Sequence, residues 1–412
     1  MSVTSSTVKR AFKYRFHPTD EQAAELARTF GCVRKVYNMA LAARSEAWTL
    51  RQERVDYNTT SAMLTEWKKT EELAFLNEVS SVPLQQALRH LQGAYTNFFA
   101  KRAKYPHFKS RKKSRASAEY TTSAFRYRNG NLTLAKMAGP LDIVWSRPLP
   151  EGSEPSKVTV SRDASGRWFV SMLCEDTIQA LPKAVDPVTG AARAVGIDVG
   201  LTSLLTLSTG EKIANPRHGK ADRKALAKAQ RELARKEKGS NNRDKARVKV
   251  ARVHARITDR RTDHLHKLTT RLVRENQTIV IEDLNIAGMV KNHSLARAVS
   301  DASWFQFRGM LEYKCAWYGR ELIAVDQWYP STKTCSACGH VVAKMPLNVR
   351  DWTCARCATV HDRDVNAAIN ILAAGLAVTA CGDGVRPQRK PPGGQSSAKQ
   401  ETQAARAGIP SL

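Results

Sequence analysis

Residues 194–209 read AVGIDVGLTSLLTLST, two apolar runs on either side of a glycine-containing turn. Runs of this length predict a pair of short, buried strands. Asp198 lies inside the first run, where an isolated carboxylate is costly unless it is paired or binds a metal. Glu282 likewise ends the apolar run TIVI at residues 278–281, and Asp364 lies at the start of a predicted helix with the sequence RDVNAAINIL.

Three acids in separate apolar segments predict one shared cation site, and carboxylate and water oxygens suit Mg²⁺ or Mn²⁺. A pair of such ions roughly 4 Å apart can activate water and stabilise the leaving oxygen in phosphodiester hydrolysis. Taken singly, each acid is better explained as a helix cap or a strand-end turn, so the hypothesis depends on all three together. Two neighbouring acids are left out of it. Strand alternation places Asp283 on the face opposite Glu282, and Asp362 precedes the helix, where capping explains it.

Four of the eight cysteines form two CxxC pairs, which predict one metal site. The pairs are Cys335 with Cys338 and Cys354 with Cys357. Four thiolates at this spacing can surround Zn²⁺ at about 2.3 Å, and with every position taken by sulfur the zinc is structural. Coincidence or a redox pair are the alternatives. The remaining cysteines, which we expect to be buried as small hydrophobic residues, are Cys32, Cys174, Cys315 and Cys381.

The charge of the chain predicts an acidic partner. Its 412 residues include 66 Lys and Arg against 38 Asp and Glu, a formal net charge of +28. Nucleic acid is the first candidate partner and an anionic membrane surface the second. The membrane is the weaker candidate, because the longest apolar stretch, residues 367–381, is interrupted by polar residues and is shorter than the roughly 20 residues of a span. The N-terminus lacks the apolar core of a secretory signal, which together with the cysteine usage favours a reducing cytoplasm.

Two segments concentrate the positive charge. Residues 101–117 contain eight Lys or Arg and no acid, together with Tyr105 and Phe108, a mixture suited to a nucleic-acid backbone with unstacked bases. A solvated linker explains this segment about as well. Residues 220–261 carry 16 Lys or Arg against 5 acids and are interrupted at 239–242, which predicts a basic helical hairpin.

The periodicity of the chain changes along its first half. Thr19 and Gln22 have the spacing of a capping box, and the apolar residues that follow recur every three to four positions. From about residue 120 to 176 the period is two, with a turn at Asn129-Gly130. These patterns predict a helical module followed by a small β-domain.

Several motifs occur together in a fixed order along the chain. They are GIDVG at 196–200, IEDL at 281–284, PSTKTCSACG at 330–339 followed by WTCARC at 352–357, and HDRDVNAAINI at 361–371. This ordered combination resembles the transposon-encoded TnpB (OrfB) proteins, which are similar to type V CRISPR nucleases. The N-terminal stretches YRFHPTDEQ and FGCVRKVYN also resemble the opening of that family. The resemblance covers about residues 8–375.

The resemblance implies a multidomain α+β fold. Its parts are an N-terminal helical recognition module, a small β-barrel (wedge) domain and an RNase H-like (RuvC) α/β nuclease domain with an inserted zinc ribbon. The expected bounds are 1–16 and 117–186 for the wedge domain, 17–116 for the recognition domain, 191–333 and 359–380 for the nuclease domain, 334–358 for the zinc ribbon and 381–412 for a disordered tail.

The resemblance also implies an RNA-guided DNA endonuclease that cleaves double-stranded DNA beside a short transposon-adjacent motif. The acidic triad of the family falls on Asp198, Glu282 and Asp364, which would hold two Mg²⁺ (or Mn²⁺) ions, and the four paired cysteines would hold Zn²⁺. Hydrolysis would leave a 5′ phosphate and a 3′ hydroxyl. The implied partners are a guide RNA from the transposon end and double-stranded target DNA, with no membrane and no small-molecule substrate. The implied location is a bacterial or archaeal cytoplasm, in association with the nucleoid.

The residues implied to read the DNA motif are Tyr57, Gln85 and Thr122, a correspondence that rests on flanking pattern only. Ser81 stands where relatives can carry Lys, so the motif that is read can differ. Residues 292–301, between two of the catalytic motifs, are either a mobile lid or an ordinary surface loop.

Three other functions compete with this one. A nucleic-acid-binding regulator of transposition that does not cut would not need the intact acids. A DNA-joining transposase can use an RNase H-like fold with three acids, so the acids alone do not separate it from a nuclease. A basic ribosome-associated protein with a zinc ribbon leaves the three acids in apolar segments without a role.

Overall fold

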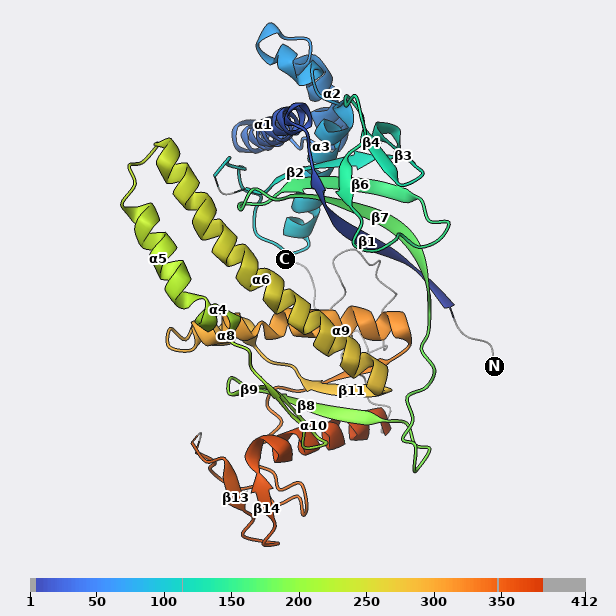
Figure 1. Cartoon of the computed structure of the whole chain (residues 1–412), viewed down its shortest axis with the longest axis vertical. Coiled ribbons are helices and arrows are strands. Elements are labelled where there is room, and N and C mark those ends of the chain that lie inside the picture. The colour runs from blue at the N-terminus through green and yellow to red at the C-terminus, as the bar shows by residue number, and fades with distance from the viewer. Residues whose placement is uncertain (1–4, 113, 347, 381–412) are drawn as a thin grey trace, which may run out of the picture. The chain divides into compact units, whose positions relative to one another are not determined.

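The computed structural model describes residues 5–112, 114–346 and 348–380 (Figure 1). The predicted disordered tail 381–412, and with it Cys381, lies outside the described residues. The chain divides into two compact units. The first comprises the residues up to Leu181 together with Arg217–His264, and the second comprises Pro182–Pro216 and the residues from Leu265 onward.

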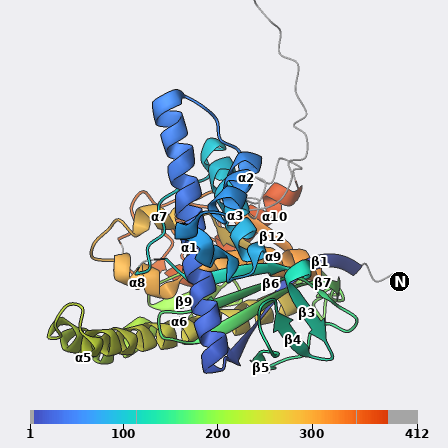
Figure 2. The same cartoon turned by 90° about the horizontal axis from the view of Figure 1, so that it is seen from above.

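The first unit contains a long antiparallel sheet and a group of helices (Figure 2). Its elements are β1 (Ser5–His17), α1 (Asp20–Arg51), α2 (Tyr57–Trp67), the 3-10 helix η1 (Glu71–Asn77), α3 (Ser81–Phe99), β2 (Ala116–Thr121), the 3-10 helix η2 (Thr122–Ala124), β3 (Phe125–Arg128), β4 (Asn131–Leu134), β5 (Asp142–Val144), β6 (Pro155–Arg162), β7 (Trp168–Gln179), α4 (His218–Ala221), α5 (Arg223–Ala234) and α6 (Asn241–Glu275), whose last residues belong to the second unit.

Local sequence explains the main features of this unit. Thr19 caps α1 and forms the predicted capping box with Gln22, each accepting a backbone hydrogen bond from the other at 3.2 Å. The five-stranded sheet has the order β2-β6-β7-β1-β5. The predicted turn at Asn129-Gly130 joins β3 to β4, and both of its residues have positive φ, as a tight hairpin requires. The predicted basic hairpin is α5 and α6.

The second unit is a mixed sheet with helices on both faces. Its elements are β8 (Ala194–Val199), β9 (Ser203–Leu207), β10 (Lys212–Ala214), β11 (Thr278–Glu282), α7 (Ile286–Met289), α8 (Ala296–Ala302), α9 (Trp304–Tyr318), β12 (Glu321–Val325), β13 (Asp351–Thr353), β14 (Val360–Asp362) and α10 (Arg363–Ala380).

The strand order in this sheet is β10-β9-β8-β11-β12, with β8, β11 and β12 parallel and β9 and β10 antiparallel to their neighbours. Figure 1 shows α9 and the end of α6 above the sheet and α10 below it. Residues 195, 197, 279 and 281 face the core that α6 and α9 complete. The alternate residues Gly196 and Val280 face α10. Since strand side chains alternate, Asp198 and Glu282 belong to the face that α10 covers.

Gly196 allows α10 to lie directly against β8. A Cβ at this position would lie 2.2 Å from the carbonyl oxygen of Ala368 and 2.7 Å from the backbone nitrogen of Leu372. We therefore expect Gly196→Ala to lower the free energy of unfolding by about 1–3 kcal/mol, the usual cost of overpacking. Urea unfolding measures this. Gly309→Ala on α9 is the matched control, because a Cβ there meets nothing within 4 Å, and an equal loss in both variants would contradict the explanation.

Residues 296–302 form α8, so the interpretation of 292–301 as an ordinary surface loop is wrong for its second half, and the alternative of a mobile lid stays a prediction. Val299 and Ala302 are buried in the same core as α9, which explains why this part of the chain is ordered as a helix. No helix in the described ranges combines the length and apolar character that crossing a membrane requires.

Candidate active site and cysteine cluster

The structure brings the three predicted acids to one edge of the second sheet. Ile281 pairs with Ile197 in the parallel register of β11 and β8, so Glu282 and Asp198 follow at adjacent positions on neighbouring strands. Asp364 lies in the first turn of α10, the helix that packs on the same face. Each acid comes from a different element, as the sequence predicted.

The electrostatics of Asp198 show that the three carboxylates lie near one another. Burial, and after it the negative charges of Glu282 and Asp364, together raise the pKa of Asp198 to about 8, against the opposing effect of Arg363 and Arg350. Burial also raises the pKa of Glu282, while a hydrogen bond from the Ser331 hydroxyl to its Oε1, 2.7 Å long, acts in the opposite direction. A bound cation would relieve this accumulation of buried negative charge, so the donor set fits a hard divalent metal.

The carboxylates are spread more widely than the cysteines. Among the described residues, the four paired cysteines are the only group of three or more Cys, His, Asp or Glu whose ligand atoms all lie within 4.8 Å of one another. Asp364 is turned toward Arg350, whose Nη1 lies 3.2 Å from its Oδ1. Ser331 holds Glu282.

The two neighbouring acids that were left out of the predicted site have other partners in the structure. Asp283 forms an ion pair with Arg308 of α9. Asp362 accepts a hydrogen bond of 2.9 Å from the backbone nitrogen of Val365, which caps α10, and it also pairs with Lys212. Neither acid is available as an unpaired ligand.

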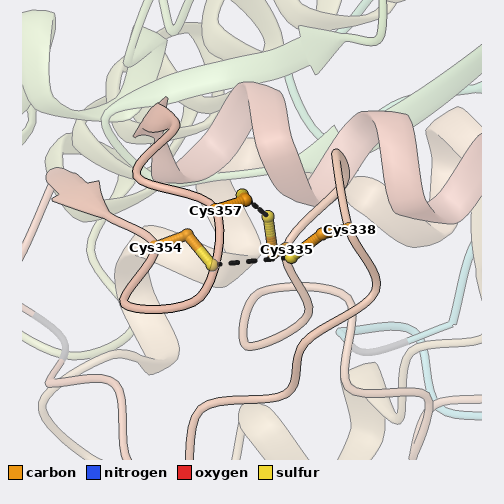
Figure 3. Close-up of side chains that lie close together, drawn as sticks. All are labelled: Cys335, Cys338, Cys354 and Cys357. Atoms are coloured by element: carbon orange, nitrogen blue, oxygen red, sulfur yellow. Dashed lines mark hydrogen bonds between the residues drawn. The ribbon is translucent and has the colours of Figure 1, made fainter.

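The four cysteines converge from two turns, as Figure 3 shows. The sulfur of Cys335 lies 3.6 Å from that of Cys357, and the sulfur of Cys338 lies 3.7 Å from that of Cys354. A tetrahedron with metal–sulfur bonds of about 2.3 Å has edges of about 3.8 Å, so the cluster fits zinc. The sulfur of Cys357 also lies 3.2 Å from the hydroxyl oxygen of Thr359. Cys32, Cys174 and Cys315 are buried, as expected.

Comparisons with known proteins identify the family of the chain. A family model described as "Probable transposase" (OrfB of the IS605 group) matches residues 169–293, one described as "Cas12f1-like, TNB domain" matches 304–371, and one described as "Helix-turn-helix domain" matches 5–53. A protein of Streptomyces pristinaespiralis, provisionally named an RNA-guided DNA endonuclease, is 71% identical over 98% of this chain and 99% of its own. The chain belongs to the TnpB (OrfB) family.

Other matches extend over nearly the whole chain. The Escherichia coli K12 protein InsQ, also provisionally named an RNA-guided DNA endonuclease, is 35% identical over 92% of this chain and 96% of its own. A solved structure of a Cas12f1–sgRNA–target DNA complex superposes with a TM-score of 0.54 at 13% identity, covering 89% of this chain and 98% of that one. This likeness shows a shared fold. In the segment matched as a helix-turn-helix domain, the structure has β1 followed by the single long helix α1.

The three residues that the TnpB resemblance assigned to motif reading lie on separate elements of the first unit. Gln85 on α3 and Thr122 in η2 are exposed. Tyr57 begins α2 and is half-buried, and its hydroxyl accepts a hydrogen bond of 3.3 Å from Nε of Arg89. All three side chains have access to solvent, and their role stays a prediction.

Sequence reasoning missed four polar residues of the candidate site. Arg350 pairs with Asp364, and His361 places its Nε2 3.0 Å from the sulfur of Cys335. Ser331 and Asn370 are both 4% exposed. Their signal in the sequence was weak, because a buried polar side chain becomes informative only when its partner, far away in the chain, is known.

The first unit also holds a cationic pocket of about 510 Å³, here called the arginine pocket. It is lined by the end of β1, the β6–β7 turn and one side of α6, with five arginines, namely Arg15, Arg167, Arg252, Arg256 and Arg260. Asp222 holds Arg256 and Arg260 in place, and Asp259 is the one acid of the lining. Trp168 adds aromatic surface, and the buried Phe16 packs against its ring. Guanidinium groups beside aromatic rings suit a phosphate backbone with its bases.

Proposed function

We propose that this chain is a transposon-encoded, RNA-guided DNA endonuclease that hydrolyses phosphodiester bonds of double-stranded DNA beside a short motif. The observation that carries the proposal is the meeting of Asp198, Glu282 and Asp364 at one sheet edge, with the pKa of Asp198 raised by burial and by the other two acids. The names of the relatives at 71% and 35% identity support it. Guide RNA would supply sequence specificity through base pairing.

We assign the second unit to an RNase H-like (RuvC) nuclease domain at residues 191–333 and 359–380, with a zinc ribbon at 334–358. The order β10-β9-β8-β11-β12, with an antiparallel hairpin beside parallel strands, supports this assignment. In the first unit, residues 17–116 would be the recognition domain. Residues 1–16 and 117–186 would form the wedge barrel, to which the five-stranded sheet and the separate hairpin β3–β4 would both belong.

Asp198, Glu282 and Asp364 would hold Mg²⁺ or Mn²⁺, and the four cysteines would hold a structural Zn²⁺. When bound, the divalent ions would supply a Lewis acid that activates water and neutralises charge on the leaving oxygen. The chain itself presents two carboxylates from adjacent strands and a third from α10. Ser331 orients Glu282 through its hydroxyl. The products would carry a 5′ phosphate and a 3′ hydroxyl.

Nucleic acid would occupy the basic surfaces of the chain. The arginine pocket would bind backbone phosphates, and Tyr57, Gln85 and Thr122 would read the motif beside the target. In the basic segment 101–117, Phe108 is exposed, and the hydroxyl of Tyr105 is hydrogen-bonded to that of Tyr95 at 3.0 Å.

A protein with this function would work in the cytoplasm, at the nucleoid.

The arginine pocket gives a first prediction for RNA binding. We expect the double substitution Arg15→Ala with Arg252→Ala to weaken RNA binding. The slope of log affinity against log salt concentration should also become less steep, by about 1 for each phosphate that these arginines neutralise. Filter binding of the co-purifying RNA across a salt series measures both quantities. Arg128→Ala is the control, since Arg128 is exposed on β3 outside the pocket. Equal slopes for both variants would contradict the assignment.

The nuclease proposal is tested by purifying the full chain with its bound RNA, sequencing that RNA and offering a plasmid that carries the matching target. We expect cleavage that requires Mg²⁺ and leaves ligatable 5′ phosphates. Binding without cleavage would instead indicate a regulator, and joined transposon ends formed without added RNA would indicate a transposase.

A further inference from the structure

Residues 331–336 lead from β12 into the first cysteine pair and are fastened to α10 by two buried amides. Asn370 donates from Nδ2 to the carbonyl oxygens of Ser331 at 2.8 Å and Thr334 at 2.6 Å. Asn366 donates to the same Thr334 oxygen at 2.8 Å and accepts from the backbone nitrogen of Ser336 at 2.9 Å. The segment is thus fixed at three backbone positions.

The two amides are 1% and 4% exposed and lie four residues apart, so they share one face of α10. The same helix presents Asp364 in its first turn. Apolar side chains would fill this space at least as well if only burial mattered. Buried amides instead require partners and so specify which backbone groups they meet. They therefore set the register of the segment against the helix.

The two ends of the segment contact two different sites. At its start, the hydroxyl of Ser331 donates to Oε1 of Glu282 at 2.7 Å. At its other end, the sulfur of Cys335 belongs to the cysteine cluster and lies 3.0 Å from Nε2 of His361. His361 is in β14, which continues directly into α10. The segment therefore connects the cysteine cluster to Glu282 through short polar contacts, while the backbone of β14 and α10 connects the cluster to Asp364.

We propose that residues 331–336 form a brace that ties the zinc cluster to the active site, in which Asn366 and Asn370 fix the segment on α10 and Ser331 positions the carboxylate of Glu282. The proposal rests on the proposed function and assigns three positioning residues to it. Without the serine hydroxyl, nothing in the brace holds Oε1 of Glu282 against the repulsion of Asp198. Groups that orient metal ligands from outside typically change metal affinity 10- to 100-fold when they are removed.

The test compares Ser331→Ala with Ser331→Thr, which keeps a hydroxyl, in the full-length protein. Mn²⁺ binding is followed by the loss of the electron paramagnetic resonance signal of the free ion, with zinc content measured by mass spectrometry. We expect Ser331→Ala to weaken Mn²⁺ binding about 10-fold at unchanged zinc content, and Ser331→Thr to restore most of it. The Mg²⁺ concentration for half-maximal cleavage should rise in parallel in Ser331→Ala. Thr332→Ala, which alters the adjacent residue, is the matched control and should bind Mn²⁺ like the wild type.

Asn370→Ala tests the fixing of the brace on α10. We expect weaker Mn²⁺ binding from this variant as well, while circular dichroism shows whether it is folded. Unchanged Mn²⁺ affinity in both Ser331→Ala and Asn370→Ala would overturn the proposal, as would equal losses in Ser331→Ala and Thr332→Ala. Mn²⁺ binding is measured without cleavage, so these outcomes are distinct from failure of the nuclease function. The nuclease function would fail if the wild-type protein bound Mn²⁺ and RNA but did not cut DNA.

Discussion

Replacing Asp198 by asparagine is expected to lower the rate of DNA cleavage on the order of 10³-fold, which corresponds to about 4 kcal/mol of transition-state stabilisation. Asparagine has nearly the same shape as aspartate but no charge, so the change removes one anionic ligand from the site without opening a cavity. Guide RNA binding should be unaffected, because Asp198 lies on the sheet of the second unit, outside the arginine pocket.

The same substitution should make the metal-free protein more stable. Burial and the charges of Glu282 and Asp364 raise the pKa of Asp198 to about 8, which means that the ionised form is disfavoured in the folded state. A neutral amide avoids this cost, as is common where function requires a strained site. Thermal unfolding in buffer without added Mg²⁺ or Mn²⁺ should therefore give a higher Tm for Asp198→Asn than for the wild type, whereas added Mg²⁺ should stabilise the wild type more.

Asp283→Asn is the matched control for both measurements. Asp283 lies one residue beyond Glu282 but pairs with Arg308 on α9. We expect near wild-type cleavage and a slightly lower Tm, since an ion pair is removed. If Asp283→Asn and Asp198→Asn reduced cleavage equally, the acidic site would be wrongly assigned.

The positions of the three acids could be predicted because each carries a local signal. A carboxylate within or beside an apolar run is costly to bury unless it is paired or binds a metal. Asp198, Glu282 and Asp364 all stand in such positions in the sequence. The hairpin at Asn129-Gly130 and the cap at Thr19 were predictable for the same reason, since their signals lie within a few residues.

The remaining parts of the site depend on interactions between distant segments. Ser331 reaches Glu282 across 49 positions, and Asn370 reaches Thr334 across 36. The residues next to them in the sequence do not indicate these partners. The helix α8 was missed for a similar reason, because packing of Val299 into the core decides its structure. Local pattern thus located the reacting groups, and tertiary structure was needed to find what holds them.

The second large effect is expected from removing zinc with Cys354→Ser. This cysteine lies outside residues 331–336, so any change at the acids must reach them through the cluster. Structural zinc contributes about 10–16 kcal/mol to the folding of small metal-binding domains. We expect zinc content to fall well below one equivalent, and both Mn²⁺ binding and cleavage to be abolished even at high Mg²⁺ concentration.

Cys315→Ala separates loss of zinc from loss of a buried thiol. Cys315 is 1% exposed on α9 in the same unit and takes no part in the cluster. This variant should lose some stability but keep its zinc, its Mn²⁺ affinity and its cleavage activity. If Cys354→Ser instead lost zinc and still bound Mn²⁺ and cut DNA normally, the cluster would be independent of the active site. In that case residues 331–336 would keep their position, and Ser331 its contact with Glu282, without zinc. The amides of Asn366 and Asn370 alone would then suffice to fix the segment on α10.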